Sequence, residues 1–140
     1  MIFHKTTDKG TQIVSFEIIT LHTSGMRYTG ETEIVMKDGK AEVSQYAIRY
    51  TQGENIRVLE KRAVCDEQKM LKLLNDCKLL SWDGFNGPHP KGVLDGTMFT
   101  LNAVVNGNQK IHASGSENFP KHYRDFKDGL YNIFRDTPAG

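Results

Sequence analysis

The stretch HASGSENFPKHYRDF, residues 112–126, gathers side chains whose types could do chemistry. Ser114 and Ser116 are potential nucleophiles, and His112 and His122 are potential bases. A serine hydrolase needs its nucleophile on a sharp turn, beside a base and facing donors for the oxyanion. HASGS departs from the GxSxG pattern of such a turn, and no second motif supplies an oxyanion loop. A small hydrolase built on these residues is therefore the alternative hypothesis, and no catalytic residue is predicted.

The same stretch could instead bind an anion. Backbone amides of a Ser-Gly-Ser turn before a helix can hold phosphate or carboxylate, and nearby cations would help, whereas Glu117 would oppose binding. The candidate ligand-binding residues here are Ser114, Gly115, Ser116, Lys121, His122 and Arg124.

A structural role explains these residues most simply. Gly115 gives the chain freedom to turn from strand to helix, and a Cβ there would be costly if its φ angle is positive. Phe119 is held extended because it precedes Pro120, which suits the first turn of a helix. We expect a strand-to-helix junction rather than a catalytic site.

A second candidate site is WDGFNGPHPKGVLDG, residues 82–96. Four glycines and two prolines predict a loop, in which Trp82 and His89 could contact a ligand. Asp83, His89 and Asp95 are potential metal ligands, but no HxH or HExxH spacing supports a metal. We therefore predict no metal and no cofactor.

A protein partner is suggested by SQYAIRYTQ, residues 44–52. Tyr46 and Tyr50 alternate along it, and Arg49 lies between them; aromatic side chains with arginine suit an interface. The same alternation also suits an ordinary strand covered by helices.

Hydrophobic periodicity predicts the elements that position these residues. Alternation predicts strands, and spacing of three and four residues predicts helices. Asp38-Gly39 and Asn106-Gly107 predict tight hairpin turns. The expected strands are 12–21, two within 26–50, 56–64, 97–105 and 109–113, and the expected helices are 66–80 and 120–135.

The order of these elements is ββββ-α-ββ-α. It predicts one α+β domain over residues 1–140, with a mainly antiparallel sheet and both helices on one face. Residues 1–10 and 136–140 are expected to be flexible. In the first strand, Val14, Phe16 and Ile18 are expected to share one face, and Asp66 is expected to cap the first helix. The expected core contacts join Phe99, Leu101, Tyr123, Phe126 and Leu130.

Charge and hydropathy limit the classes of partner that this chain could have. The 140 residues include 18 Lys and Arg against 17 Asp and Glu. Basic and acidic side chains are nearly equal in number on either side of Val64, so no basic arm that would bind nucleic acid is expected. No run is long enough to span a membrane, and the start MIFHKTTDKG lacks the apolar stretch of an export signal. We expect a cytoplasmic protein, in which Cys65 and Cys77 bracket a helix and stay unpaired.

The C-terminal part resembles a family of small, mostly uncharacterised bacterial α+β domains. The likeness covers roughly residues 80–134, and it departs from the family at Phe99, often Trp there, and at Glu117, often Asn. It implies a fold rather than an activity. The matching positions are Trp82, Leu94-Asp95-Gly96, Phe99, Ser114-Gly115, Phe119-Pro120 and the helix from Tyr123 to Phe134.

The function expected from these observations is a non-catalytic binding or interaction module. Its partner would be a protein or a small anionic ligand, and the second alternative places an anion or small molecule at the sheet and the 82–96 loop. The sequence leaves the oligomeric state open.

Overall fold

A computed structural model describes residues 12–25, 28–94 and 96–136 of the chain. Of the ends predicted to be flexible, residues 1–10 and 137–140 lie outside the described residues. The elements are β1 (Phe16–Ser24), β2 (Thr29–Lys37), β3 (Lys40–Thr51), β4 (Glu54–Asp66), α2 (Glu67–Asp76), the 3₁₀ turn η1 (Leu79–Trp82), β5 (Asn86–Gly87), β6 (Met98–Val105), β7 (Gln109–Ser116) and α3 (Tyr123–Asp136).

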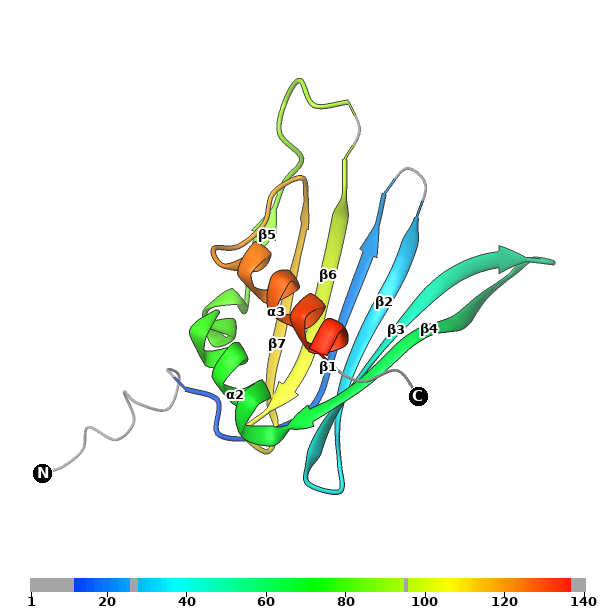
Figure 1. The fold of residues 1–140 in the computed structure, drawn as a ribbon. Coiled ribbons are helices and arrows are strands. Elements are labelled where there is room, and N and C mark those ends of the chain that lie inside the picture. Colours follow the sequence, from blue (N-terminus) through cyan, green and yellow to red (C-terminus); the bar gives the residue numbers. More distant parts are fainter. Residues whose placement is uncertain (1–11, 26–27, 95, 137–140) are drawn as a thin grey trace, which may run out of the picture.

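The strands form one twisted sheet in the order β4-β3-β2-β1-β6-β7-β5 (Figure 1). The neighbouring pairs from β4 to β7 are antiparallel, and the short β5 pairs with β7 in parallel. The predicted α+β class and order of elements are therefore confirmed. The first helix ends at Asp76 rather than at residue 80, η1 follows it before the predicted loop, and β5 lies inside that loop.

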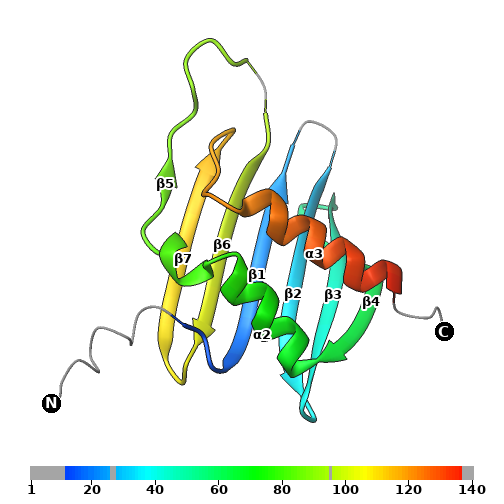
Figure 2. The same cartoon turned by 60° about the vertical axis from the view of Figure 1, so that its left-hand side comes forward.

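Both helices cross the same face of the sheet, with α3 running from β7 towards β4 (Figure 2). We call this the helix face and the opposite side the open face. The core lies between the sheet and the helices, where Phe99, Leu101 and Phe126 are buried. The Phe99 and Tyr123 ring centroids lie 4.9 Å apart, and Leu130 belongs to the same buried cluster. The predicted packing of strand 97–105 against the last helix is confirmed.

The hairpin turns use the left-handed backbone conformation that their sequences predict. Asp38 and Gly39 have φ angles of 54° and 77°, and Asn106 and Gly107 have 52° and 92°. Positive φ at both central positions matches the right-handed twist of the strands that the turn joins.

The prediction for the first strand is wrong about its buried face. Val14 is 69% exposed, and Phe16 is buried. A register shift between Phe16 and Ile18 in the pairing with β6 moves Ile18 away from the core and brings Ile19 and Leu21 into it. A bulge adds one residue to a strand, so every later side chain changes face.

The first helix starts where predicted, but Asp66 does not cap it with its side chain. Asp66 occupies the N-cap position without a side-chain cap hydrogen bond. Its carboxylate instead pairs with the Lys40 ammonium on β3, at 3.2 Å. Cys65 and Cys77 flank α2 and are both free, as predicted.

The predicted 82–96 loop covers the β7 edge of the sheet. Gly84 donates a hydrogen bond from its amide to the His112 carbonyl, at 2.9 Å. The Ser114 amide donates to the Phe85 carbonyl, at 3.1 Å, and the Asp83 carboxylate accepts from the His112 amide, at 2.9 Å. These bonds occupy backbone groups that β7 would otherwise expose.

Within the described ranges, no helix has the length and apolar character needed to cross a membrane.

Candidate functional site

The predicted anion-binding stretch is divided between the two faces of the sheet. Ser114 and Ser116 lie with His89 around an open cavity of about 480 Å³. His122 and Arg124 instead line a cavity of about 720 Å³ at the start of α3. The chain passes to the helix face after β7, so the serines and the cations do not form one cradle.

Gly115 is required at the end of β7 for a reason that the sequence did not reveal. Its φ angle is not in the left-handed region, so the expected role for a positive φ is wrong. A Cβ at this position would collide with the Asn118 carbonyl oxygen and would lie 2.9 Å from the Phe99 ring. The glycine therefore allows the loop after β7 to pass close over the strand.

The histidine beside Ser116 is His89, which the sequence placed in the other candidate site. The His89 Nδ1 and Ser116 Oγ atoms lie 2.7 Å apart. The two histidines proposed as bases make other contacts: His112 Nδ1 lies 2.7 Å from the Asn102 side-chain oxygen, and His122 Nδ1 lies 3.0 Å from an Asp125 carboxylate oxygen. The predicted pairing of the serines with His112 or His122 is not present.

Trp82 belongs to the core rather than to a ligand pocket. Its ring is 1% exposed and meets Phe126 edge to face, with centroids 5.6 Å apart. Its indole Nε1 donates to the Lys121 carbonyl oxygen, at 3.1 Å. This bond fixes the backbone just before α3. The Lys121 side chain is exposed and does not line the cavity at the start of α3, which we call the α3 cavity.

The α3 cavity has charges of both signs. Besides His122 and Arg124, its walls include the carboxylates of Glu117, Asp125 and Asp128. Lys127 lines the cavity as well, so three acidic groups offset three basic ones and no excess of positive charge attracts a free anion. The geometry gives less support to an anion site than the sequence did.

Two titratable groups near this cavity have shifted pKa values. Burial raises the pKa of Tyr123 to about 12, and its hydroxyl has no hydrogen-bond partner among the described residues. Neighbouring side chains shield the amine of Lys127 enough to lower its pKa, although the side chain as a whole is exposed. Tyr123 is enclosed by the rings of Trp82, Phe99 and Phe119.

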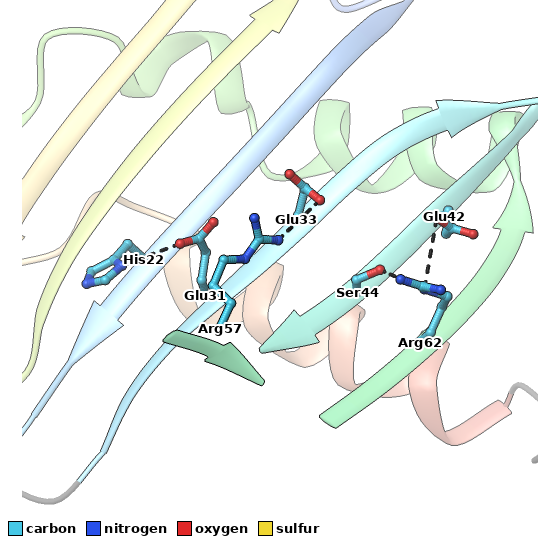
Figure 3. A network of polar contacts seen from close by, with 7 residues as sticks. All are labelled: His22, Glu31, Glu33, Glu42, Ser44, Arg57 and Arg62. Atoms are coloured by element: carbon cyan, nitrogen blue, oxygen red, sulfur yellow. Dashed lines mark hydrogen bonds and ion pairs between the residues drawn. The ribbon is translucent and has the colours of Figure 1, made fainter. Parts of the chain in front are cut away.

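Charged side chains on the open face neutralise one another (Figure 3). Arg57 Nη2 lies 3.5 Å from Glu33 Oε1. Arg62 Nε lies 3.1 Å from the Ser44 hydroxyl and 3.9 Å from a Glu42 carboxylate oxygen. This part of the open face therefore has no excess of one charge that would attract a polyanion.

The Arg57 guanidinium also lies 3.8 Å from the centroid of the Tyr46 ring. Tyr46 is half-buried beneath it, while Tyr50, four positions later on the same strand, is 75% exposed. Of the two tyrosines that the sequence suggested for an interface, Tyr46 is thus covered by Arg57 and Tyr50 is exposed to solvent.

Exposed apolar side chains gather on the β3–β4 hairpin. Eleven large hydrophobic side chains are exposed in the described part of the chain, and five of them belong to this hairpin. We call these five the hairpin patch: Tyr50, Ile56, Val58, Leu59 and Val64.

The hairpin patch extends over both faces of β4. Val58 is paired with Ala47, which is buried on the helix face, and Leu59 is paired with Tyr46 on the open face. Strand periodicity in residues 56–64 predicts only an ordinary strand, so it does not single out these positions of β4. The signal was available in IRVL, where apolar residues occur at both parities.

In the described ranges, no group of three His, Cys, Asp or Glu side chains gathers to hold a metal ion. Asp95, one of the potential ligands, lies outside these ranges. No protein-family model and no curated protein matches the sequence. The resemblance of residues 80–134 to small bacterial domains therefore stays a prediction.

Proposed function

We propose that this chain is a non-catalytic protein-interaction module that contacts its partner through the β3–β4 hairpin. The observation that carries the proposal is the hairpin patch, five exposed large hydrophobic side chains on neighbouring strands. Single exposed apolar side chains are ordinary, but the concentration of several of them on one hairpin favours a surface for another protein.

The composition of the hairpin supports a protein partner. Tyr50 is 75% exposed at the end of β3, and Arg57 stacks on Tyr46. Tyrosine and arginine are enriched among the residues that dominate binding energy at protein interfaces. The ion pairs of Arg57 and Arg62 would form a polar rim beside the apolar positions.

A second candidate function is a hydrolase that uses Ser116 as nucleophile and His89 as base. The contact of 2.7 Å between these side chains favours it, because a nucleophile needs a base within hydrogen-bond reach. The binding module is preferred because the ring of His89 contacts the Val93 carbonyl rather than a carboxylate.

Site-specific photo-crosslinking tests the proposal. A photo-reactive phenylalanine analogue replaces Tyr50 in one variant and Lys110 in a control, inside the cells from which the chain comes. Lys110 is exposed on β7, far along the strand order from β3. We expect a discrete crosslinked protein from position 50 and none from position 110.

Competition shows whether the crosslink depends on the hairpin patch. Purified unlabelled chain should suppress the product when added to an extract, and an Ile56→Lys, Leu59→Lys double variant should not. Equal crosslinking at both positions, or equal competition by both proteins, would contradict the proposal.

A further inference from the structure

We propose that a cavity between α3 and the neighbouring ends of β1 and β2 binds a small hydroxycarboxylate, whose carboxylate pairs with the Lys127 ammonium. This β1–β2 cavity has a volume of about 310 Å³, which suits a small organic ligand. Its lining includes none of the residues of the hairpin patch, so the inference does not depend on the proposed function. The lining side chains that carry it are Thr23, Tyr28, Thr32, Gln45, Thr97 and Lys127.

The helix face changes from apolar to polar where it reaches this cavity. Leu21 on β1 and Ile34 on β2 are 3% and 1% exposed beneath the helices. The next positions on the same face are Thr23 and Thr32, and both are half-buried. Among the described residues, neither threonine hydroxyl has a hydrogen-bond partner. Because a shielded hydroxyl without a partner costs free energy, these two positions favour a ligand with polar groups.

Lys127 supplies the charge of the β1–β2 cavity. It is the only charged side chain among the described residues of the lining. Its amine lies 6.0 Å from the centroid of the Tyr123 ring, at the outer limit of a cation–π contact. In the described ranges no carboxylate forms an ion pair with it, and burial lowers its pKa. A partly shielded ammonium without a counter-charge favours a ligand that carries a carboxylate.

Tyr28 forms the wall of the cavity towards β4. A Cβ at Gly30 would lie 2.5 Å from the Tyr28 ring, so the glycine lets the ring lie over the strand. The Tyr28 hydroxyl donates to a Glu60 carboxylate oxygen, at 2.9 Å, and accepts a hydrogen bond from the Gln45 amide nitrogen, at 3.3 Å. Glu60 itself does not line the cavity. The wall therefore offers an aromatic surface to the carbon chain of a ligand and no opposing carboxylate.

The adjoining α3 cavity limits the charge of the ligand. The two cavities share Thr97 and Lys127 in their walls, so a longer ligand can extend from one into the other. There it meets the carboxylates of Glu117, Asp125 and Asp128, which repel a second carboxylate but can accept hydrogen bonds from hydroxyl groups. The chemistry thus favours one carboxylate and several hydroxyls over a dicarboxylate or a phosphate dianion.

An NMR titration of the isotopically labelled full chain with gluconate tests the inference. We expect saturable shifts of the Thr23, Thr32 and Lys127 amides. Three matched compounds should bind much more weakly: sorbitol lacks the carboxylate, hexanoate lacks the hydroxyls, and glucarate adds a second carboxylate. The absence of saturable shifts with gluconate, or equal binding of sorbitol and gluconate, would overturn the inference.

Substitutions show which side chains hold the ligand. Lys127→Met keeps most of the stem and should weaken gluconate binding about tenfold or more, because it removes a charged hydrogen bond. Lys121→Met is the control, since Lys121 is exposed and lines neither cavity. Thr23→Val should weaken binding severalfold, whereas Thr20→Val, on the opposite face of β1, should not. Unchanged gluconate affinity in Lys127→Met would refute the proposed ion pair.

Stability measurements separate a ligand role from a structural one. Thermal unfolding of Thr23→Val should show no loss of stability, because the hydroxyl has no described protein partner to lose. A destabilised Thr23→Val that binds gluconate as well as the wild type would assign Thr23 to the fold instead.

The titration of Lys127 gives a further readout. A bound carboxylate favours the protonated amine, so the pKa of Lys127, followed by NMR of its side chain, should rise when gluconate saturates the chain. A pKa that gluconate leaves unchanged would contradict the ion pair. None of these measurements involves a partner protein, so their outcome and that of the crosslink at position 50 are decided separately.

Discussion

The Ser116 hydroxyl lies 2.7 Å from Nδ1 of His89, and the other ring nitrogen of His89 contacts the Val93 carbonyl. The carbonyl can only accept a hydrogen bond, so it favours the tautomer with the proton on Nε2. Nδ1 is then free to accept the serine proton. The spacing matches a nucleophile and its base, but a backbone carbonyl stands where hydrolases place a carboxylate.

The first prediction is that this pair does not catalyse hydrolysis. The purified chain should remain unlabelled by a fluorophosphonate probe, which modifies activated serines. Ser116→Ala should fold normally, and Ser114→Ala serves as the control because Ser114 lines the same cavity. Stoichiometric labelling that is lost in Ser116→Ala and His89→Ala but kept in Ser114→Ala would establish the hydrolase instead.

The second prediction concerns the close approach at the end of β7. Gly115→Ala should lower the free energy of unfolding by about 1–3 kcal/mol, because the new methyl group forces the Asn118 carbonyl and the Phe99 ring to move. Urea denaturation measures the change. In the matched control Gly39→Ala, the added Cβ meets no neighbouring atom within 4 Å, so only the strain of a positive φ remains. An equal or smaller loss in Gly115→Ala would show that the contact is not tight.

The third prediction concerns the packing of α3. Phe126 is fully buried against Trp82, so Phe126→Ala should cost about 3–5 kcal/mol of unfolding free energy. Tyr131 lies on the same helix and is 60% exposed. Tyr131→Ala should therefore change stability by only about 0.5 kcal/mol. Similar losses in thermal or urea unfolding of the two variants would mean that the buried face of α3 is assigned wrongly.

The fourth prediction uses the hydroxyl of Tyr123, which is buried without a described partner. A buried unsatisfied group costs about 1–3 kcal/mol, so Tyr123→Phe should be at least as stable as the wild type at neutral pH. Trp82→Phe removes the bond from the indole to Lys121 and serves as the contrast, with a clear loss of stability.

The same tyrosine should give a signature at high pH. Burial raises its pKa from 10.0 to about 12, so the folded state keeps a proton that the unfolded state releases. Its contribution to stability is complete below pH 10 and is lost as the pH rises towards 12. The stability advantage of Tyr123→Phe should grow over this range in urea titrations. A difference that does not change with pH would show that Tyr123 is not shielded from solvent.

Local sequence determined the turns, the helices and most of the strands. The turn at Asp38-Gly39 depends on residues that tolerate positive φ angles, and the burial of Phe126 and Leu130 in α3 follows from apolar spacing along one helix. These features depend on neighbours within a few positions, so the order ββββ-α-ββ-α and the core between β6 and α3 could be predicted.

The tertiary structure alone decided the rest. The bulge before Ile18 reversed the faces of β1 because pairing with β6, not propensity, sets the register. Ser116 contacts His89 rather than His112 because residues 83–87 fold back along β7. The free edge of β4 depends on which strand ends the sheet. Each of these features joins segments far apart in the chain, where the contacts are chosen by the packing of the whole sheet and not by the residues next to them.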